Sequence, residues 1–393
     1  MVGADVVAAC ALSAVPGIGA STLLRVVRKF DSLTKAMAAG PKALLEAGGE
    51  LRLKPEAGEY LAKEPDLEDL GLRAVAAARR VGARVVLFGD DWYPPGLRQL
   101  KTPPPLLYVR GHLAPAVPRA AVVGSRNADE QGLEIARSFG DGLARAGVQV
   151  VSGGARGIDT AAHDGAFWGQ GTSLVVLGSG IDVPYPPENA DLFDRIASGG
   201  GAVISELPPG SPPAPINFPR RNRIVAALAD AVVVVRAALR SGALITADHA
   251  ADLGRPIFVV PGDPGNPLAE GPNALLRTRA ARVSMGPVDV LNFMKWPVPD
   301  ELTRIGPAAE ASQYADPGFP AAPQAEQKAE PEREVLDEAS VRLWRLLDER
   351  TPAHVDDLAL RSQIPAPQAL RKLSELELKG MVVQRPGKYF LRR

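Results

Sequence analysis

The sequence predicts an α/β protein whose central domain is an extended Rossmann-like fold with a doubly wound, mainly parallel sheet. From about residue 84, short β-branched runs that end in glycine alternate with helical stretches. Near-continuous apolar strands separated by helices are typical of a parallel sheet covered on both faces. We expect a helical domain at 1–70, the sheet domain at 71–294, a Pro/Ala-rich linker at 295–333 and a winged-helix domain at 334–393.

Residues 1–70 are predicted to form short helices. The turn Pro16-Gly17-Ile18-Gly19 precedes apolar residues at helical spacing, namely Leu23, Leu24, Val27 and Phe30. This order is typical of a helix-hairpin-helix or SAM-like module, in which glycines let backbone amides approach a DNA phosphate at a helix N-terminus. The alternative is a helix-turn-helix that only packs or binds protein.

The central domain is predicted to contain seven strands and at least four helices. The strands are expected at 85–88, 121–123, 149–151, 174–177, 202–204, 232–235 and 257–260. The helices are expected at 133–146, 160–167, 224–228 and 243–253. Ligands of such sheets bind beyond the carboxyl ends of the strands, so the loops there are the candidate sites.

The last domain has the order of a winged helix, three helices followed by a β-hairpin. Three apolar helical faces are expected: Val341, Leu343, Trp344 and Leu347; Val355, Leu358 and Leu360; Leu370, Leu373, Leu376 and Leu378. The hairpin is expected at 381–391. Residues 297–331 hold seven Pro and eight Ala with little apolar periodicity, which predicts an extended linker.

Composition excludes several classes of protein. The 393 residues carry 45 basic and 45 acidic side chains, which argues against a uniformly basic coating protein. Cys10 is the single cysteine, so an intramolecular disulfide and a zinc site are not expected. The apolar stretch 6–15 is too short to span a membrane. We expect a cytoplasmic protein without metal, cofactor or membrane segment.

Glycine-rich loops follow four of the predicted strands. They contain Gly124-Ser125-Arg126, Gly153-Gly154, Gly178-Ser179-Gly180 and Pro261-Gly262. Glycines there permit tight turns and are expected to leave backbone N–H groups uncovered for a phosphate. Neither the dinucleotide G-x-G-x-x-G pattern nor the P-loop pattern occurs in these loops, so an ordinary NAD or ATP site is not supported.

A basic cluster opens a predicted helix in the same domain. It reads Asn217-Phe218-Pro219-Arg220-Arg221-Asn222-Arg223, with Arg236 and Arg240 following. The planar guanidinium suits phosphate, and Phe218 could stack on an unpaired base. Alternatively, these arginines pair with carboxylates and Phe218 packs in the core.

Catalytic groups are scarce. His163 is the one histidine near a glycine loop, and a structural role is expected for it. Asp159 and Asp182 are expected to cap helices. The G-x-S-x-G nucleophile elbow does not occur around the loop serines. We therefore predict no catalytic residues and no enzyme.

Taken together and in order, these motifs resemble the DNA processing protein A (DprA/Smf) family over about residues 84–293. The resemblance implies a dimeric protein that binds single-stranded DNA and loads the RecA recombinase in natural transformation, recombination and repair. It implies strand-binding roles for Gly124, Ser125, Arg126, Gly153, Gly154, Arg156, Gly180, Asn217, Phe218, Arg220, Arg221 and Arg223. Arg236 stands where the family usually has Glu, a change that either enlarges the phosphate surface or removes a structural pair.

The sequence of the winged-helix domain does not decide whether this domain binds duplex DNA or protein. Arg371, Lys372, Arg385 and Lys388 lie where such folds touch duplex DNA, although many winged helices bind protein.

Two other hypotheses concern the whole chain. The glycine loops also resemble those of nucleoside-monophosphate phosphoribohydrolases, for which Glu206 would be the nearest catalytic acid. An adaptor that only tethers RecA-like partners would have no DNA affinity of its own.

Overall fold

The apolar runs of the central domain form one nine-stranded sheet. Its strands are β1 (Ala83–Leu87), β2 (Leu106–Gly111), β3 (Arg119–Val123), β4 (Gln149–Ser152), β5 (Ser173–Val176), β6 (Ala202–Ser205), β7 (Ala231–Val234), β8 (Ile257–Val259) and β9 (Arg282–Val283). They lie in the order β1-β2-β6-β5-β4-β3-β7-β8-β9. Only β1–β2 and β2–β6 pair antiparallel within the described sheet. The predicted α/β class with a mainly parallel sheet is confirmed.

This computed structural model describes residues 3–114, 117–278, 281–303, 337–348, 353–378, 381–385 and 389–392. The chain divides into two compact units, residues 1–313 and 314–393. Within the described residues, no helix combines the length and apolar character needed to cross a membrane.

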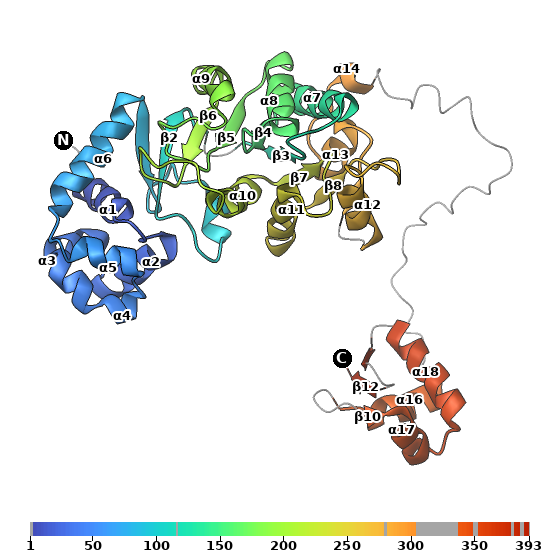
Figure 1. The fold of residues 1–393 in the computed structure, drawn as a ribbon. Helices are drawn as coiled ribbons and strands as arrows, with labels where there is room; N and C mark the ends of the chain where they lie inside the picture. The colour runs from blue at the N-terminus through green and yellow to red at the C-terminus, as the bar shows by residue number, and fades with distance from the viewer. Residues whose placement is uncertain are drawn as a thin grey trace. The chain divides into compact units, whose positions relative to one another are not determined.

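Successive side chains along each strand point to opposite faces of the sheet, so a hydrophobic core forms on each face. Ala121 and Val123 of β3 face one core, and Ala120 and Val122 face the other. Helices α10 (Asn217–Leu228) and α11 (Gly242–Asp252) cover the first face, while α7 (Glu130–Arg145), α8 (Ile158–Trp168) and α13 (Pro287–Met294) cover the second (Figure 1). Helices α9 (Ala190–Ser198) and α12 (Glu270–Arg277) complete the layers. Each helix lies where its apolar face is buried.

Two strands escape sequence prediction for different reasons. The run Leu106 to Val109 of β2 is apolar but follows three consecutive prolines, which signal a loop. The edge strand β9 contains two exposed residues, too few for any periodicity. Strand β2 supplies the two antiparallel pairings and thereby extends the parallel sheet toward the N-terminal helices.

Six helices form the N-terminal part: α1 (Ala4–Ala14), α2 (Ala20–Phe30), α3 (Leu33–Glu46), α4 (Gly48–Leu51), α5 (Pro55–Leu61) and α6 (Leu67–Arg80). They gather at the β1 and β2 end of the sheet (Figure 1). Gly17 adopts a φ of 79° in the turn between α1 and α2, a conformation that favours glycine.

The boundary predicted at residue 70 falls inside helix α6. This helix continues to Arg80 because Val75 and Ala78 pack in one core with Tyr108 of β2 and Val203 of β6. The helical part and the sheet therefore share buried apolar surface, and both belong to the first compact unit.

The second unit has the predicted order of three helices and a hairpin. Helices α16 (Glu338–Leu346), α17 (Val355–Ser362) and α18 (Ala366–Leu378) pack against a sheet of order β10-β12-β11. Its strands are β10 (Ala353–His354), β11 (Val382–Arg385) and β12 (Tyr389–Arg392). Most residues of the predicted faces lie in its core, but Leu360 is 81% exposed and was wrongly assigned to it. The side chain of Leu378 lies outside the described residues. The winged-helix prediction is confirmed.

The linker predicted at 295–333 is only partly described. Helix α14 (Asp300–Thr303) lies within its first part. Residues 304–333 of the predicted linker lie outside the described residues, so its extended conformation stays a prediction.

Candidate functional site

A groove of about 720 Å³ opens at the carboxyl edge of the sheet, where the loops after β3, β4 and β7 meet. The chain runs from β3 to β4 on one side, and β7 lies on the other side of β3, which makes this the topological switch point of the sheet. Helices α10 and α11 contribute the remaining walls. Six predicted site residues line this groove: Gly124, Ser125, Arg126, Gly153, Phe218 and Arg221.

A row of a cation and two aromatic rings stands at the groove. The guanidinium of Arg126 lies 5.0 Å from the centroid of the Phe218 ring. The Tyr185 ring follows at 5.4 Å from Phe218, at an interplanar angle of 43°. Arg126 is exposed and has no carboxylate partner among the described residues. Its charge is therefore available to an anion, and Phe218 is partly exposed beside it.

The glycines after the strands make room for side chains of α9 and α10. A Cβ on Gly178 would lie 2.9 Å from the Phe218 ring, and a Cβ on Gly153 would clash with the Arg221 guanidinium. A Cβ on Gly154 would meet the Phe193 ring at 2.7 Å. These positions need glycine for close packing.

The expectation that the glycine loops leave their amides uncovered is wrong at three positions. The N–H of Ser125 donates to Arg236 O at 2.6 Å, and that of Gly153 donates to Asp159 Oδ2 at 3.2 Å. The N–H of Gly180 donates to Ser211 O at 2.9 Å. Because these donors are already used, they are not free to bind a phosphate.

Arg221 is a buried brace, which corrects its expected role as a surface counter-charge. The residue is 6% exposed, and its Nη1 donates to the carbonyls of Gly153 and Val176 at the ends of β4 and β5. Burial lowers the pKa of Arg221 to about 10, so the guanidinium stays charged at neutral pH. It holds two strand ends against α10.

Asp159 lies beneath the groove and does not cap its helix. Its carboxylate accepts hydrogen bonds from the amides of Gly153 and Ala155, both at 3.2 Å. Burial raises the pKa of Asp159, against the opposing charge of Arg221 and these hydrogen bonds. Asp182 likewise stabilises a loop, accepting from Gly210 N at 2.7 Å. Both acids are therefore structural anchors of loops.

Two predicted arginines have their charge compensated elsewhere. Arg156 pairs with Glu188 at 2.8 Å on the surface. The Nη2 of Arg223 donates to both carboxylate oxygens of Glu206 at 2.5 and 2.6 Å, and its Nη1 donates to Thr102 O at 2.9 Å. Neither arginine lines the groove. Their assignment as free counter-charges is not supported.

The remaining predicted residues lie around the groove without lining it. Gly154 and Gly180 are buried behind the loops. Asn217 and Arg220 face a second cavity of about 540 Å³, which Arg221 and Arg223 also line. The first turn of α10 thus separates two cavities and contributes side chains to both.

The sequence-based site missed several groove residues. Tyr185, Asn222, Arg240 and Ser241 line it. Asn222 donates to Gly242 O at 2.9 Å, which ties α10 to the start of α11, and the Ser241 side chain caps α11. Arg240 is exposed and has no carboxylate partner among the described residues. Its place in the basic run 217–240 was the available signal.

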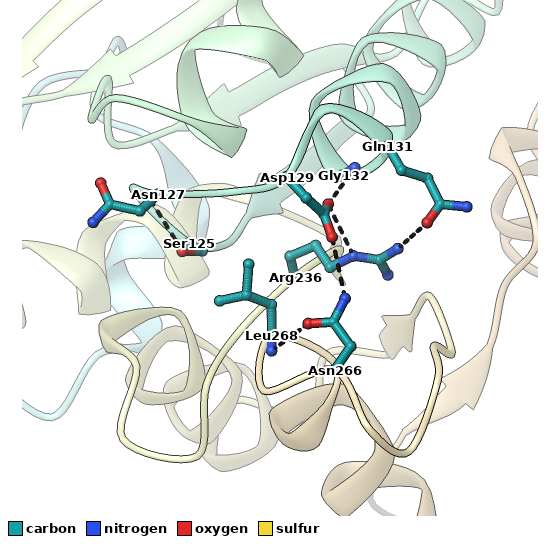
Figure 2. Close-up of polar contacts among 8 residues, drawn as sticks. All are labelled: Ser125, Asn127, Asp129, Gln131, Gly132, Arg236, Asn266 and Leu268. Carbon is teal, nitrogen blue, oxygen red and sulfur yellow. Dashed lines mark hydrogen bonds and ion pairs between the residues drawn. The ribbon is translucent and has the colours of Figure 1, made fainter.

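The contacts of Arg236 show whether it enlarges the phosphate-binding surface or has a structural role. Figure 2 shows its guanidinium directed at Asp129 and Gln131, to which Nε and Nη2 donate at 3.4 and 3.1 Å. The side chain is 3% exposed and lines neither cavity. Arg236 therefore does not enlarge the anion surface, because it serves as a structural partner for an acid.

The Arg236 network also positions the loop after β3. Arg236 O accepts the Ser125 N–H, and Ser125 Oγ accepts from Asn127 N at 3.1 Å. Asp129 caps α7 at Gly132 and accepts from Asn266 Nδ2 at 3.1 Å (Figure 2). This arrangement connects the chain before Arg126 with the start of α7 and with the loop after β8.

His163 is a structural residue, as predicted. Ser173 Oγ gives its proton to Val150 O, so it accepts from His163 Nδ1 at 2.6 Å. Burial, followed by the charge of Arg221, lowers the pKa of His163 to about 3. A histidine this buried and this weakly basic is poorly suited to act as a general base.

Acidification should destabilise the protein through His163. Its pKa is about 3 in the folded state and about 6.5 when unfolded, so the unfolded chain binds the extra proton between these values. Stability is expected to fall as pH drops below about 6.5, by about 2 kcal/mol at pH 5. Urea unfolding of the wild type and His163→Gln at pH 7 and pH 5 measures this. Equal pH dependence of the two proteins would contradict it.

The predicted basic contacts of the winged helix are only partly described. Arg371 pairs with Glu375 at 3.5 Å, and Lys372 contacts Asp337 and Glu375, both at 2.9 Å. These ion pairs raise the pKa of Lys372. The side chain of Arg385 and the whole of Lys388 lie outside the described residues. Duplex binding by this domain stays a prediction.

Comparisons with known proteins match both parts of the chain. The family model described as DNA recombination-mediator protein A matches residues 84–295, and the DprA winged helix domain model matches residues 320–388. Protein Smf of Escherichia coli K12 is 40% identical over 301 residues, which cover 76% of this chain and 75% of that protein.

The similar solved structures include two of DNA processing protein A. That of DNA processing protein A from Streptococcus pneumoniae has a TM-score of 0.62 and 30% identity, and the match covers 74% of this chain and 98% of that one. That of DNA processing protein A from Helicobacter pylori, described by its single-stranded DNA binding mode, has a TM-score of 0.50 and 27% identity. The match covers 55% of this chain and 98% of that one.

Proposed function

The chain belongs to the DNA recombination-mediator protein A family, and from this premise we propose that its groove binds single-stranded DNA with little sequence preference. In this proposal Arg126 and Arg240 neutralise phosphates, and Phe218 and Tyr185 offer faces on which bases stack. Stacking on aromatic rings is tolerant of sequence because every base has a π-face.

One observation carries the proposal, the row formed by Arg126, Phe218 and Tyr185 at the switch point of the sheet. Single-strand sites combine cations that follow the backbone with aromatic platforms for bases. The row presents both within a few ångströms. The described binding mode of the similar Helicobacter pylori protein supports the same ligand.

Further parts of the proposal rest on the family alone. We propose that the protein transfers its strand to the RecA recombinase, as the description of the family as recombination mediators suggests. Homodimerisation, duplex contacts by the winged helix, a cytoplasmic location and the absence of enzymatic activity belong to the same proposal. The groove residues themselves carry only the strand-binding step.

The function is tested by titrating the full chain with labelled oligo-dT and with a duplex of equal length. We expect tighter binding of the single strand, with an affinity that falls steeply as salt rises because bound phosphates release counterions. Salt-independent binding, or equal affinity for both ligands at every salt concentration, would contradict the groove as a single-strand site.

The contacts of Glu206 weigh against the phosphoribohydrolase hypothesis. Both of its carboxylate oxygens accept from Arg223, and Glu206 lines the second cavity rather than the groove. A carboxylate held as an ion pair is poorly placed to attack or protonate a nucleotide in the groove. Incubation of the protein with AMP, followed by detection of free adenine, tests this. We expect no adenine above the background without protein.

A further inference from the structure

A second cavity separates the N-terminal helices from the sheet domain. We name it the domain cleft, and it has a volume of about 540 Å³. The hairpin residues Gly17, Ile18 and Gly19 and the start of α2 line one wall. The first turn of α10 and the ends of β2 and β5 line the other. The predicted helix-hairpin-helix turn and the basic cluster of α10 therefore line opposite walls of the domain cleft.

The charge of the domain cleft is strongly positive. Six basic and two acidic side chains line it. Both acids already have cationic neighbours, since Glu206 pairs with Arg223 at 2.5 Å and Glu56 lies 3.8 Å from Lys54 Nζ. Of the other four cations, Arg25, Arg52 and Arg220 have no ion-pair partner among the described residues, whereas Arg221 is buried and its charge is opposed by that of Asp159. The net field attracts an anion.

The cations without partners stand on both walls. Arg52 is exposed on the helical side, and Arg220 is exposed on the first turn of α10. Arg25 is held in place by hydrogen bonds from Nε to Leu51 O at 2.7 Å and from Nη2 to Thr22 Oγ1 at 3.3 Å. These bonds leave its charge uncompensated. An anion in the cleft would be approached from two directions.

The hairpin adds backbone donors to this field. Gly19 is the N-cap of α2 and supplies no side-chain cap. A Cβ on Gly19 would meet no atom within 4 Å, so space beside the turn is open. The first amides of a helix lack intrahelical acceptors, and the helix dipole favours negative charge at this end. The exposed Ser21 hydroxyl lies in the same turn and lines the cleft.

The domain cleft adjoins the groove across one turn of α10. Arg221 lines both cavities, and Phe218 in the groove lies between Asn217 and Arg220, which line the cleft. A strand whose bases stack at Phe218 needs to pass only one helical turn to bring its next phosphates into the cleft.

We propose that the domain cleft is a second phosphate-binding subsite through which the N-terminal helices extend the single-strand site. The inference rests on the proposed function of the groove, because the strand enters the cleft from there. Arg52 and Arg220 bind backbone phosphates from opposite walls, and the hairpin amides of α2 assist. The cleft therefore adds affinity only for strands long enough to reach it.

The test compares two lengths of labelled oligo-dT, about 6 and about 20 nucleotides, with the full chain. Arg52→Asn keeps a residue that tolerates the left-handed backbone found there, with a φ of 51°. Arg220→Ala removes a cation from the other wall. We expect each variant to bind the longer strand about three- to tenfold more weakly, with a salt slope smaller by about 0.7, and the shorter strand unchanged.

Arg28→Gln is the matched control, because Arg28 is exposed at the far end of α2 and lines neither cavity. It should bind both lengths as the wild type does. Wild-type affinity of Arg52→Asn and Arg220→Ala for the longer strand, with Arg126→Ala weakened for both lengths, would overturn the cleft assignment alone. Failure of the unchanged chain to bind either length would overturn the proposed function as well.

Discussion

Replacement of Arg126 by alanine is expected to weaken the binding of oligo-dT about tenfold or more, which corresponds to at least about 1.4 kcal/mol. The change removes an exposed cation without a carboxylate partner among the described residues. It also removes the neighbour that stacks on Phe218 at 5.0 Å. Fluorescence anisotropy over a range of salt concentrations should give a slope smaller by about 0.7.

Arg156→Ala is the matched control for Arg126. Arg156 is also exposed and lies on a glycine loop, but it pairs with Glu188 at 2.8 Å and does not line the groove. The control should leave affinity and salt slope near those of the wild type. If the two variants lost affinity equally, general charge would explain binding better than the groove does.

Replacement of Arg221 by methionine is expected to lower the free energy of unfolding of the sheet domain by about 3–5 kcal/mol. The variant leaves the carbonyls of Gly153 and Val176 without their donor and leaves Asp159 buried beside no cation. Urea unfolding followed by tryptophan fluorescence at neutral pH measures the loss. Strand binding should decline with it, because Gly153 lines the groove.

The neighbouring position provides the control. Arg220 is exposed and makes no ion pair among the described residues, so Arg220→Met should change the free energy of unfolding by less than about 0.5 kcal/mol. Equal unfolding midpoints for Arg221→Met and the wild type would show that the buried guanidinium is not a brace.

The strands and loops of the central domain are largely predictable from local sequence. The runs around Val123 and Val151 are β-branched, apolar and followed by glycine, and these properties act over a few residues. Strand β2 was missed because the prolines before Leu106 are typical of a loop. Its burial depends on pairing with β6, about a hundred residues later in the chain. Long-range pairing has no local signature.

The candidate site was predicted less completely than the fold. The groove contains Arg126 and Phe218 as expected, yet it also contains Tyr185 and Arg240, whose loops follow other strands. Topology brings these loops to one edge, and the sequence shows only that each is near a strand end. Arg223 was predicted to bind phosphate because its sequence neighbours give no sign of a carboxylate partner. That partner, Glu206, lies 17 residues earlier in a loop after another strand.

The cluster from Asn217 to Arg223 separates what the sequence predicts from what only the folded structure determines. The pattern alone places three arginines and a phenylalanine at the start of a helix beyond a strand end, and it indicates the family. Successive residues of a helix point about 100° apart, so Arg220, Arg221 and Arg223 face different surroundings. One is exposed at the domain cleft, one is buried under the groove and one is paired. Their surroundings come from distant segments, so only the folded chain assigns each charge its partner.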